Sequence, residues 1–168
     1  NGGEIYGNKA TGADTSTMGA GGGILIYGKQ LVTINGGNVH NNEALKGGGL
    51  TIESTVVSSG ATKLVFSGGN VYDNTASIDG GGIYVYKGYT TDYAGKVMFT
   101  GGNVTNNSCS GIGGGVFVNC AATAQFSNGN VQENTAQNGG GIALAKGANL
   151  TCNVNNYIYE TTLCQQEI

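Results

Sequence analysis

The sequence predicts an all-β fold, a right-handed parallel β-helix with three short strands per coil, about five coils and a degenerate C-terminal coil. One motif recurs five times along the 168 residues. Apolar and polar residues alternate over short stretches, and glycine-rich corners separate these stretches without hairpin turn signals or a helical period. Self-similarity of this kind is typical of stacked supersecondary units, in which each unit packs on its neighbours.

Each copy of the motif has an aliphatic residue, Asn three positions later and a small residue two positions after that. Three glycines and another aliphatic residue follow. The first parts of the copies are residues 5–10, 39–44, 71–76, 104–109 and 131–136. The aliphatic residues after the glycines are Ile24, Leu50, Ile83, Val116 and Ile142, separated by 26, 33, 33 and 26 residues.

The third coil illustrates the strands expected in every coil. Its inward residues are Leu64 and Phe66 on the first strand, Val71 on the second, and Ile83 and Val85 on the third. Coil length varies after the third strand, at 28–30, 54–62, 87–95, 120–123 and 146–148, as expected for surface loops. Like residues should stack between coils, in one column of Val32, Leu64, Val97, Ala124 and Leu150 and another of Ile34, Phe66, Phe99, Phe126 and Cys152.

Two asparagine series follow the same period. The first predicts a buried structural ladder, because stacked amides supply one another with donors and acceptors. Its members are Asn8, Asn42, Asn74, Asn107 and Asn134. The second series is expected at a corner, where Asn tolerates the left-handed conformation. Its members are Asn38, Asn70, Asn103 and Asn130.

The repeats resemble those of chlamydial polymorphic outer-membrane proteins and related autotransporter-type β-helix adhesins, whose signature is F-x-x-N followed by G-G-A-I. The matches are Val71-x-x-Asn74, then Gly81-Gly82-Ile83, with their equivalents over roughly residues 2–145. This chain has Val or Ile for Phe, and Gly for Ala before the final aliphatic residue. The resemblance implies an extracellular or surface-displayed passenger used for adhesion or as a spacer, and it brings no catalytic residues.

Composition argues against several partners. The net charge is only −3, and the seven basic residues are scattered lysines, so we expect no nucleic-acid binding. No apolar run approaches the length of a membrane-spanning helix, and we expect a chain that is not embedded in a membrane. Spacings of zinc ligands are missing, and His40 is an outward strand residue, so neither a metal nor another cofactor is predicted.

The ends differ from the middle. We expect residues 1–149 to form the repeats and 150–168 to form a degenerate last coil, a cap or a junction. An open β-helix end exposes unpaired backbone groups, so end-to-end stacking of copies into a homopolymeric filament is an alternative.

The four cysteines leave three disulfide connectivities open. Cys109 shares the column of Ala44, Ala76 and Ala136, and Cys152 shares that of Phe126, so both are expected to be buried apolar residues. Cys120 and Cys164 fall at corners.

A fragment of a polysaccharide-active β-helix enzyme is the second alternative. Glycoside hydrolysis needs two carboxylates at a defined separation. The candidate pairs are Asp73 with Glu133 and Glu43 with Asp79. Asn106 occupies the position between Asp73 and Glu133, so we interpret these acids as isolated and predict that the chain is not an enzyme. Three glycosylation sequons, at 103–105, 106–108 and 149–151, are expected from Asn-rich repeats by chance.

The outer side of the third strands is the predicted interaction face, since exposed aromatic residues on a rod favour binding. Its members are Leu25, Tyr27, Tyr84, Tyr86 and Phe117, with Tyr89 and Tyr93 in the adjoining loop. The alternative is that the 54–62 and 87–95 loops cover this face. The prediction as a whole is a non-catalytic extracellular or cell-surface rod that is structural or adhesive, with a surface receptor, a glycan or other copies of itself as partner.

Overall fold

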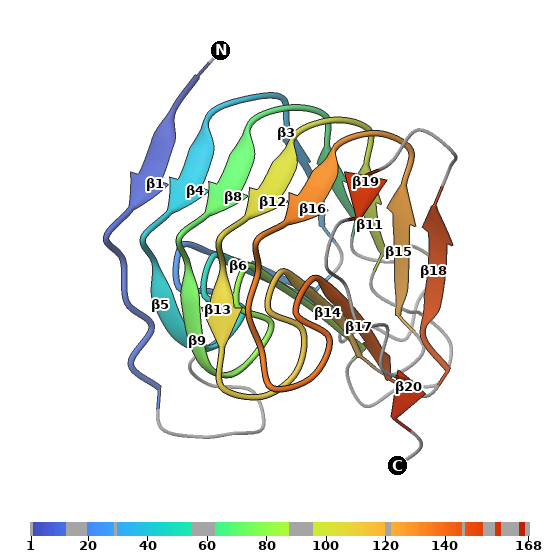
Figure 1. Cartoon of the computed structure of the whole chain (residues 1–168). Helices are drawn as coiled ribbons and strands as arrows, with labels where there is room; N and C mark the ends of the chain where they lie inside the picture. Colours follow the sequence, from blue (N-terminus) through green and yellow to red (C-terminus); the bar gives the residue numbers. More distant parts are fainter. Residues whose placement is uncertain are drawn as a thin grey trace.

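The computed structural model describes residues 2–12, 20–28, 30–54, 63–87, 96–119, 122–145, 147–152, 157–158 and 165–166. Within these ranges all regular structure is β. Figure 1 shows the strands stacked side by side, each beside the equivalent strand of the next winding, from the N-terminal to the C-terminal end. All the paired strands run parallel, as predicted, and form four sheets.

The first two sheets contain six strands each. Sheet 1 consists of β1 (Glu4–Tyr6), β4 (Asn38–His40), β8 (Asn70–Tyr72), β12 (Asn103–Thr105), β16 (Asn130–Gln132) and β19 (Tyr157–Ile158). Sheet 2 consists of β2 (Ile24–Tyr27), β6 (Leu50–Ser54), β10 (Ile83–Lys87), β14 (Val116–Val118), β17 (Ile142–Ala145) and β20 (Gln165–Gln166).

The other two sheets are smaller. Sheet 3 consists of β3 (Leu31–Ile34), β7 (Lys63–Phe66), β11 (Lys96–Phe99), β15 (Thr123–Phe126) and β18 (Asn149–Cys152). Sheet 4 consists of β5 (Glu43–Lys46), β9 (Thr75–Asp79) and β13 (Ser108–Cys109). The prediction of three strands per coil omitted sheet 4. The chain stays extended after each ladder asparagine, because the small residues Ala44, Ala76 and Cys109 turn inward there and let neighbouring windings pair.

The two predicted interior columns of sheet 3 are confirmed. The strand register aligns the first column from Val32 to Leu150 and the second from Ile34 to Cys152. Phe66, Phe99 and Phe126 are almost completely buried. The Phe99 ring stacks on Phe126 with centroids 4.4 Å apart and is tilted against Phe66 with centroids 5.5 Å apart. Together with the inward aliphatic residues of sheets 1 and 2, they form one continuous core.

The triple glycines let the windings approach closely. At Gly80 the backbone has a φ of +65°, a conformation that L-residues with side chains rarely adopt. A Cβ on Gly82 would lie 2.7 Å from the carbonyl oxygen of Gly115 and 2.9 Å from Cγ of Asn107. The third glycine thus makes room for an amide of the buried ladder.

The C-terminal segment continues the stack in the backbone. β18 begins at Asn149, one residue before the expected boundary, and β19 and β20 pair with β16 and β17. Cys152 is in register with Phe126, but it is exposed instead of buried, because β18 is the last strand of sheet 3. Among the described residues, no helix is long and apolar enough to cross a membrane.

Candidate binding face

The first asparagine series forms a hydrogen-bonded ladder inside the stack, and its middle members Asn42, Asn74 and Asn107 are buried. The Nδ2 atom of each donates to Oδ1 of the asparagine in the next winding, at 2.9–3.0 Å. The backbone N–H donates to the same oxygen. The remaining capacity of Nδ2 goes to backbone carbonyls, for Asn74 those of Val39 and Tyr72. These amides have their hydrogen bonds satisfied within the protein, so they serve the fold.

The second series forms another ladder, which we call the outer ladder, at the start of the sheet 1 strands. Its Nδ2 groups donate in the opposite direction, from Asn130 to Asn103, from Asn103 to Asn70 and from Asn70 to Asn38, at 2.8–3.0 Å. Nδ2 of Asn38 donates to Oε1 of Glu4 at 2.8 Å. These asparagines are half-buried, so part of each residue is accessible to solvent.

The expectation that the outer ladder adopts the left-handed conformation is wrong. That conformation belongs to the preceding glycines, with φ of +88°, +91°, +88° and +103° at Gly37, Gly69, Gly102 and Gly129. It also belongs to a column after the sheet 1 strands, where Asn41, Asp73, Asn106 and Glu133 have φ between +52° and +56°. Each outer-ladder asparagine is instead the first extended residue after a glycine corner.

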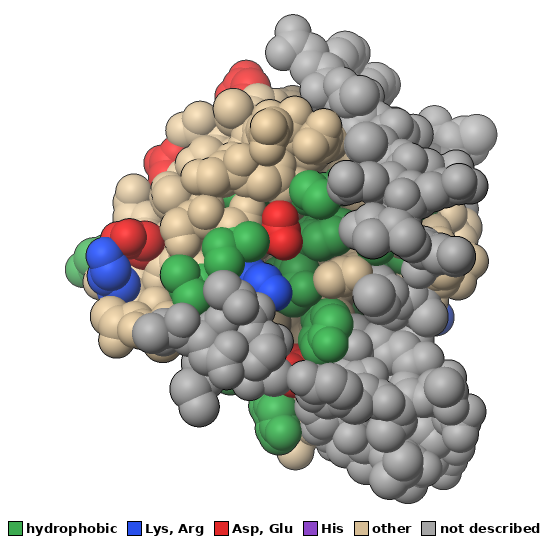
Figure 2. Space-filling model, turned by 90° about the horizontal axis from the view of Figure 1, so that it is seen from below, with side chains coloured by type: hydrophobic (Ala, Val, Ile, Leu, Met, Phe, Trp, Pro, Cys, Tyr) green, Lys and Arg blue, Asp and Glu red, His purple; other side chains and the backbone are tan. Residues whose placement is uncertain are grey.

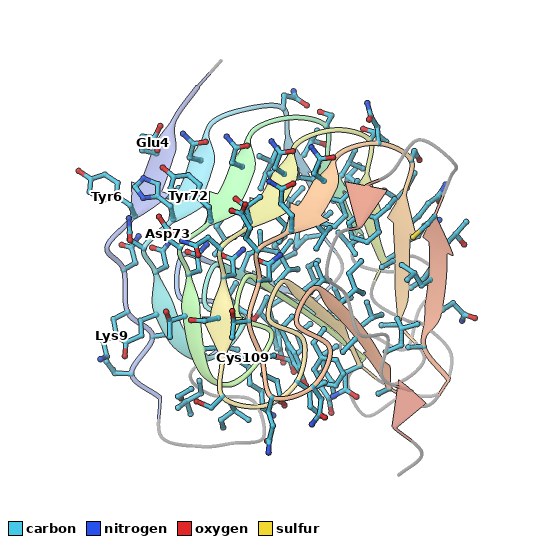
Figure 3. The ribbon with its side chains drawn as sticks, viewed as in Figure 1. Glu4, Tyr6, Lys9, Tyr72, Asp73 and Cys109 are labelled. Carbon is cyan, nitrogen blue, oxygen red and sulfur yellow. The ribbon has the colours of Figure 1, made fainter. Side chains whose placement is uncertain are left out.

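An aromatic stack lies beside the outer ladder, formed by the outward residues at the C-terminal ends of β1, β4 and β8 (Figure 3). The His40 ring is nearly parallel to those of Tyr6 and Tyr72, with centroids 5.2 and 4.7 Å away. His40 Nε2 lies 3.0 Å from Oε2 of Glu4, so one carboxylate contacts both the stack and the outer ladder. Tyr6 is 62% exposed.

Sequence reasoning missed this stack. His40 was predicted to point outward, but the stacking of its neighbours was not. The residues at that position in successive strands are Tyr6, His40, Tyr72, Thr105 and Gln132. The signal was present in the period, because the outward residue two positions before each buried ladder asparagine is aromatic in the first three windings.

A shallow depression of about 310 Å³ lies beyond the stack, lined by Asn41, Asn42, Glu43, Asp73 and Thr75. Lys9 Nζ contacts Oε1 of Glu43 at 2.8 Å. Nδ2 of Asn106 donates to Oδ1 of Asp73. The outer ladder, the aromatic stack and this depression together form a polar face, which we call the lateral face.

The predicted interaction face on sheet 2 is largely buried. Tyr84 and Phe117 are only 4% and 5% exposed and pack in a second hydrophobic cluster with Ala143. The Tyr84 hydroxyl accepts a hydrogen bond from Nδ2 of Asn119 at 2.8 Å, and Lys46 Nζ lies 5.6 Å from the ring centroid. Figure 2 shows hydrophobic side chains gathered with basic and acidic ones on the underside of the molecule.

The remaining members of that predicted face do not form a continuous exposed surface over sheet 2 within the described residues. Tyr86 is half-buried and stacks on Tyr84, and Tyr89 and Tyr93 lie outside the described residues. Leu25 and Tyr27 are exposed, but they belong to the first strand of the sheet. The aromatic pattern therefore indicates a covered hydrophobic cluster over most of sheet 2.

Two acids on this side have perturbed titration. Burial raises the pKa of Glu53, which is 4% exposed, and the nearby Lys46 partly offsets this effect. Burial also raises the pKa of Asp79, although its Oδ1 accepts a hydrogen bond from the Ile112 N–H at 2.9 Å. Both carboxyl groups therefore resist ionisation more than a free side chain does.

The two candidate carboxylate pairs are not brought together. Glu43 is in register with Thr75, whereas Asp79 is in register with Lys46. Asp73 and Glu133 share one column, and Asn106 lies between them.

Burial raises the pKa of the Cys109 thiol. Cys109 and Cys152 are free, whereas Cys120 and Cys164 lie outside the described residues.

The three glycosylation sequons lie on or next to β12, β13 and β18. Asn103 is engaged in the outer ladder, and Asn106 and Asn149 are exposed. No group of three or more His, Cys, Asp or Glu side chains in the described part of the chain is arranged to hold a metal ion.

Comparisons with family models, with curated proteins and with solved structures find no match for this chain. The function is therefore inferred from the lateral face itself.

Proposed function

We propose that this chain is a non-catalytic right-handed β-helix segment, with about five coils and a degenerate last coil, of an extracellular or cell-surface structural or adhesive protein. It binds a surface receptor or a glycan through the lateral face. Right-handedness follows the strong preference of crossovers between parallel strands. The family resemblance of the repeats supports the surface location.

The outer ladder is the single observation that carries the binding proposal. Its amides hold one another in fixed positions, yet they are half-buried and use only part of their hydrogen-bonding capacity within the described residues. In the buried ladder, by contrast, the hydrogen-bonding groups of the amides are already used within the protein, and none is left for a ligand. A rigid row of partly satisfied amides beside aromatic rings can bind a polar partner without first becoming ordered, which keeps the entropic cost of binding low.

The test compares the wild-type chain with Tyr72→Ala and Gln125→Ala on an array of extracellular-matrix proteins and glycans. Tyr72 belongs to the lateral face, whereas Gln125 is a half-buried outward residue of β15 on sheet 3. We expect binding that Tyr72→Ala weakens and Gln125→Ala leaves unchanged. Equal binding by all three proteins would show that the lateral face is not the binding surface, and turnover of any glycan on the array would contradict the non-catalytic assignment.

A filament subunit is the second candidate, and exposed apolar residues at the N-terminal end favour it. These residues are Ile5, Tyr6, Leu25, Tyr27 and Leu31, on β1, β2 and β3. Each of these strands is the outermost described strand of its sheet, and its outer backbone edge pairs with no other described strand. An open hollow of about 600 Å³ lined by residues of β1, β2, β3 and β4 lies at the same end.

Negative-stain imaging tests this candidate. Stacking of copies predicts uniform fibres that Leu31→Lys abolishes, because a charge on an edge strand opposes pairing. Short rods at every protein concentration would contradict assembly.

A further inference from the structure

The lateral face has unused hydrogen-bonding groups in a regular row. Asn70 and Asn103 each use one of two Nδ2 hydrogens and one of two Oδ1 lone pairs in the outer ladder. No other described residue takes up the remaining hydrogen and lone pair. Each of these two rungs therefore presents one donor and one acceptor, and Asn130 has an Oδ1 that accepts nothing from the described residues.

We propose that the lateral face binds an uncharged polysaccharide chain lying parallel to the long axis of the stack, along the outer ladder. This inference rests on the proposed binding function and names the class of its ligand. Sugar hydroxyls both donate and accept hydrogen bonds, and an amide with one free donor and one free acceptor matches such a group in either orientation.

The spacing of the rungs supports the orientation of the chain. Parallel strands lie about 4.7–4.9 Å apart, so successive outer-ladder amides repeat at that distance. An extended glycan chain advances by a similar length with each sugar unit. A chain along the axis can therefore place one unit near each rung, whereas a chain across the axis would meet only one rung.

The aromatic stack gives the same chain an apolar contact. Tyr72 lies two residues after Asn70 on the outward side of β8, and Tyr6 lies two residues after Glu4, which is in register with Asn38, so both rings are close to the outer ladder. The C–H groups of a sugar ring pack against exposed aromatic surface, and Tyr6 offers the most of it. Glu4 contacts Asn38 of the outer ladder and His40 of the aromatic stack, and its carboxylate can accept hydrogen bonds from further hydroxyls.

A peptide fits this face less well. Peptides that add to sheets pair with an open backbone edge, but the outer ladder lies on β4, β8, β12 and β16, each of which already has a neighbouring strand on both sides. The chain carries a net charge of only −3 with scattered lysines, so an acidic polymer would find no basic patch. These features favour a neutral glycan.

The test uses β-1,4-linked glucose and N-acetylglucosamine oligomers, from the dimer to the hexamer, in calorimetric titrations of the whole chain. Binding along the axis predicts an affinity that rises with length until the oligomer spans the rungs from Asn38 to Asn130, and then levels off. Asn103→Ala should weaken binding of the longest oligomer by about three- to tenfold and that of the dimer less. Gln125→Ala is the matched control and should leave every affinity unchanged.

The outcomes separate this inference from the proposed function. Glycan binding without dependence on length, or binding that Asn103→Ala does not weaken, would overturn the axial arrangement while leaving a binding solenoid in place. Failure of all neutral oligomers, combined with capture of a matrix protein that Tyr72→Ala abolishes, would overturn the glycan and retain the lateral face. Asn70→Ala is a second variant, and circular dichroism of both variants must match the wild type.

Discussion

The buried ladder makes a quantitative prediction for Asn74→Leu, a substitution of similar size that removes all side-chain hydrogen bonds. Asn74 is completely buried. Its Oδ1 accepts from the N–H and Nδ2 of Asn42 at 3.1 and 3.0 Å. Its Nδ2 lies 2.9 Å from Oδ1 of Asn107 and from the carbonyl oxygens of Val39 and Tyr72. Leucine can replace none of these contacts.

Some of the partners keep another bond and some do not. Oδ1 of Asn107 still accepts the backbone N–H of residue 74, and Nδ2 of Asn42 still donates to the carbonyl of Ile5. The buried N–H of Asn42 loses its acceptor, and the Val39 carbonyl loses this donor. Because a stranded buried polar group costs about 1–3 kcal/mol, we expect the free energy of unfolding to fall by about 2–5 kcal/mol.

Asn8→Leu provides the matched control, since Asn8 belongs to the same ladder but is exposed. Water can replace its bonds, so the expected loss is below about 1 kcal/mol. Urea denaturation followed by circular dichroism measures both variants, and equal slopes with urea concentration would show that the unfolded states are comparable. If Asn74→Leu and Asn8→Leu cost the same, the reasoning from buried amides is refuted.

Three further perturbations test the packing and the electrostatics. Gly82→Ala should cost about 1–3 kcal/mol in urea denaturation because the added methyl group meets backbone, whereas Gly2→Ala, with open space around it, should be neutral. Phe99→Ala should cost about 3–5 kcal/mol by the same measurement, and a smaller loss would contradict a tightly packed aromatic column. The raised pKa of Glu53 means that the folded state binds its proton more tightly than the unfolded state, so this group lowers stability as pH rises from its ordinary value of 4.5 through the folded pKa. Glu53→Gln should therefore be more stable than wild type at neutral pH and lose part of the pH dependence, and a lower urea midpoint at neutral pH would contradict this sign.

The interior of the stack could be predicted from the sequence because its physical constraint is periodic. A parallel register brings identical positions of successive repeats together, so Phe66, Phe99 and Phe126 had to meet once the repeats were aligned. The fourth sheet was not predicted, because β13 has only two residues and the register between β5 and β9 shifts between Ala44 and Lys46, which interrupts the periodic pattern of a strand.

The burial of Tyr84 and Phe117 in the predicted interaction face was not foreseen, for a related reason. Alternation along β10 correctly directs Tyr84 away from the main core, but it does not say whether solvent or another part of the chain lies on the outer side. Asn119 and Lys46, which contact Tyr84 in the structure, belong to the windings on either side of it. The repeat places these residues near Tyr84, but the direction of their side chains over its ring follows from the coordinates.

The two asparagine ladders show what local sequence could still have revealed. Both have the same residue type and period, so their recurrence alone indicates a ladder in each case. Their glycines differ, however. Each buried rung packs against the third glycine of a triplet, as Asn107 does against Gly82, and leaves no space for a ligand. Each outer rung instead follows a glycine in the left-handed conformation, as Asn70 follows Gly69. The glycine ends a corner, and the asparagine after it begins a strand and is half-buried. The position of glycine relative to asparagine therefore distinguishes the amides that hold this fold together from those that remain available to a partner.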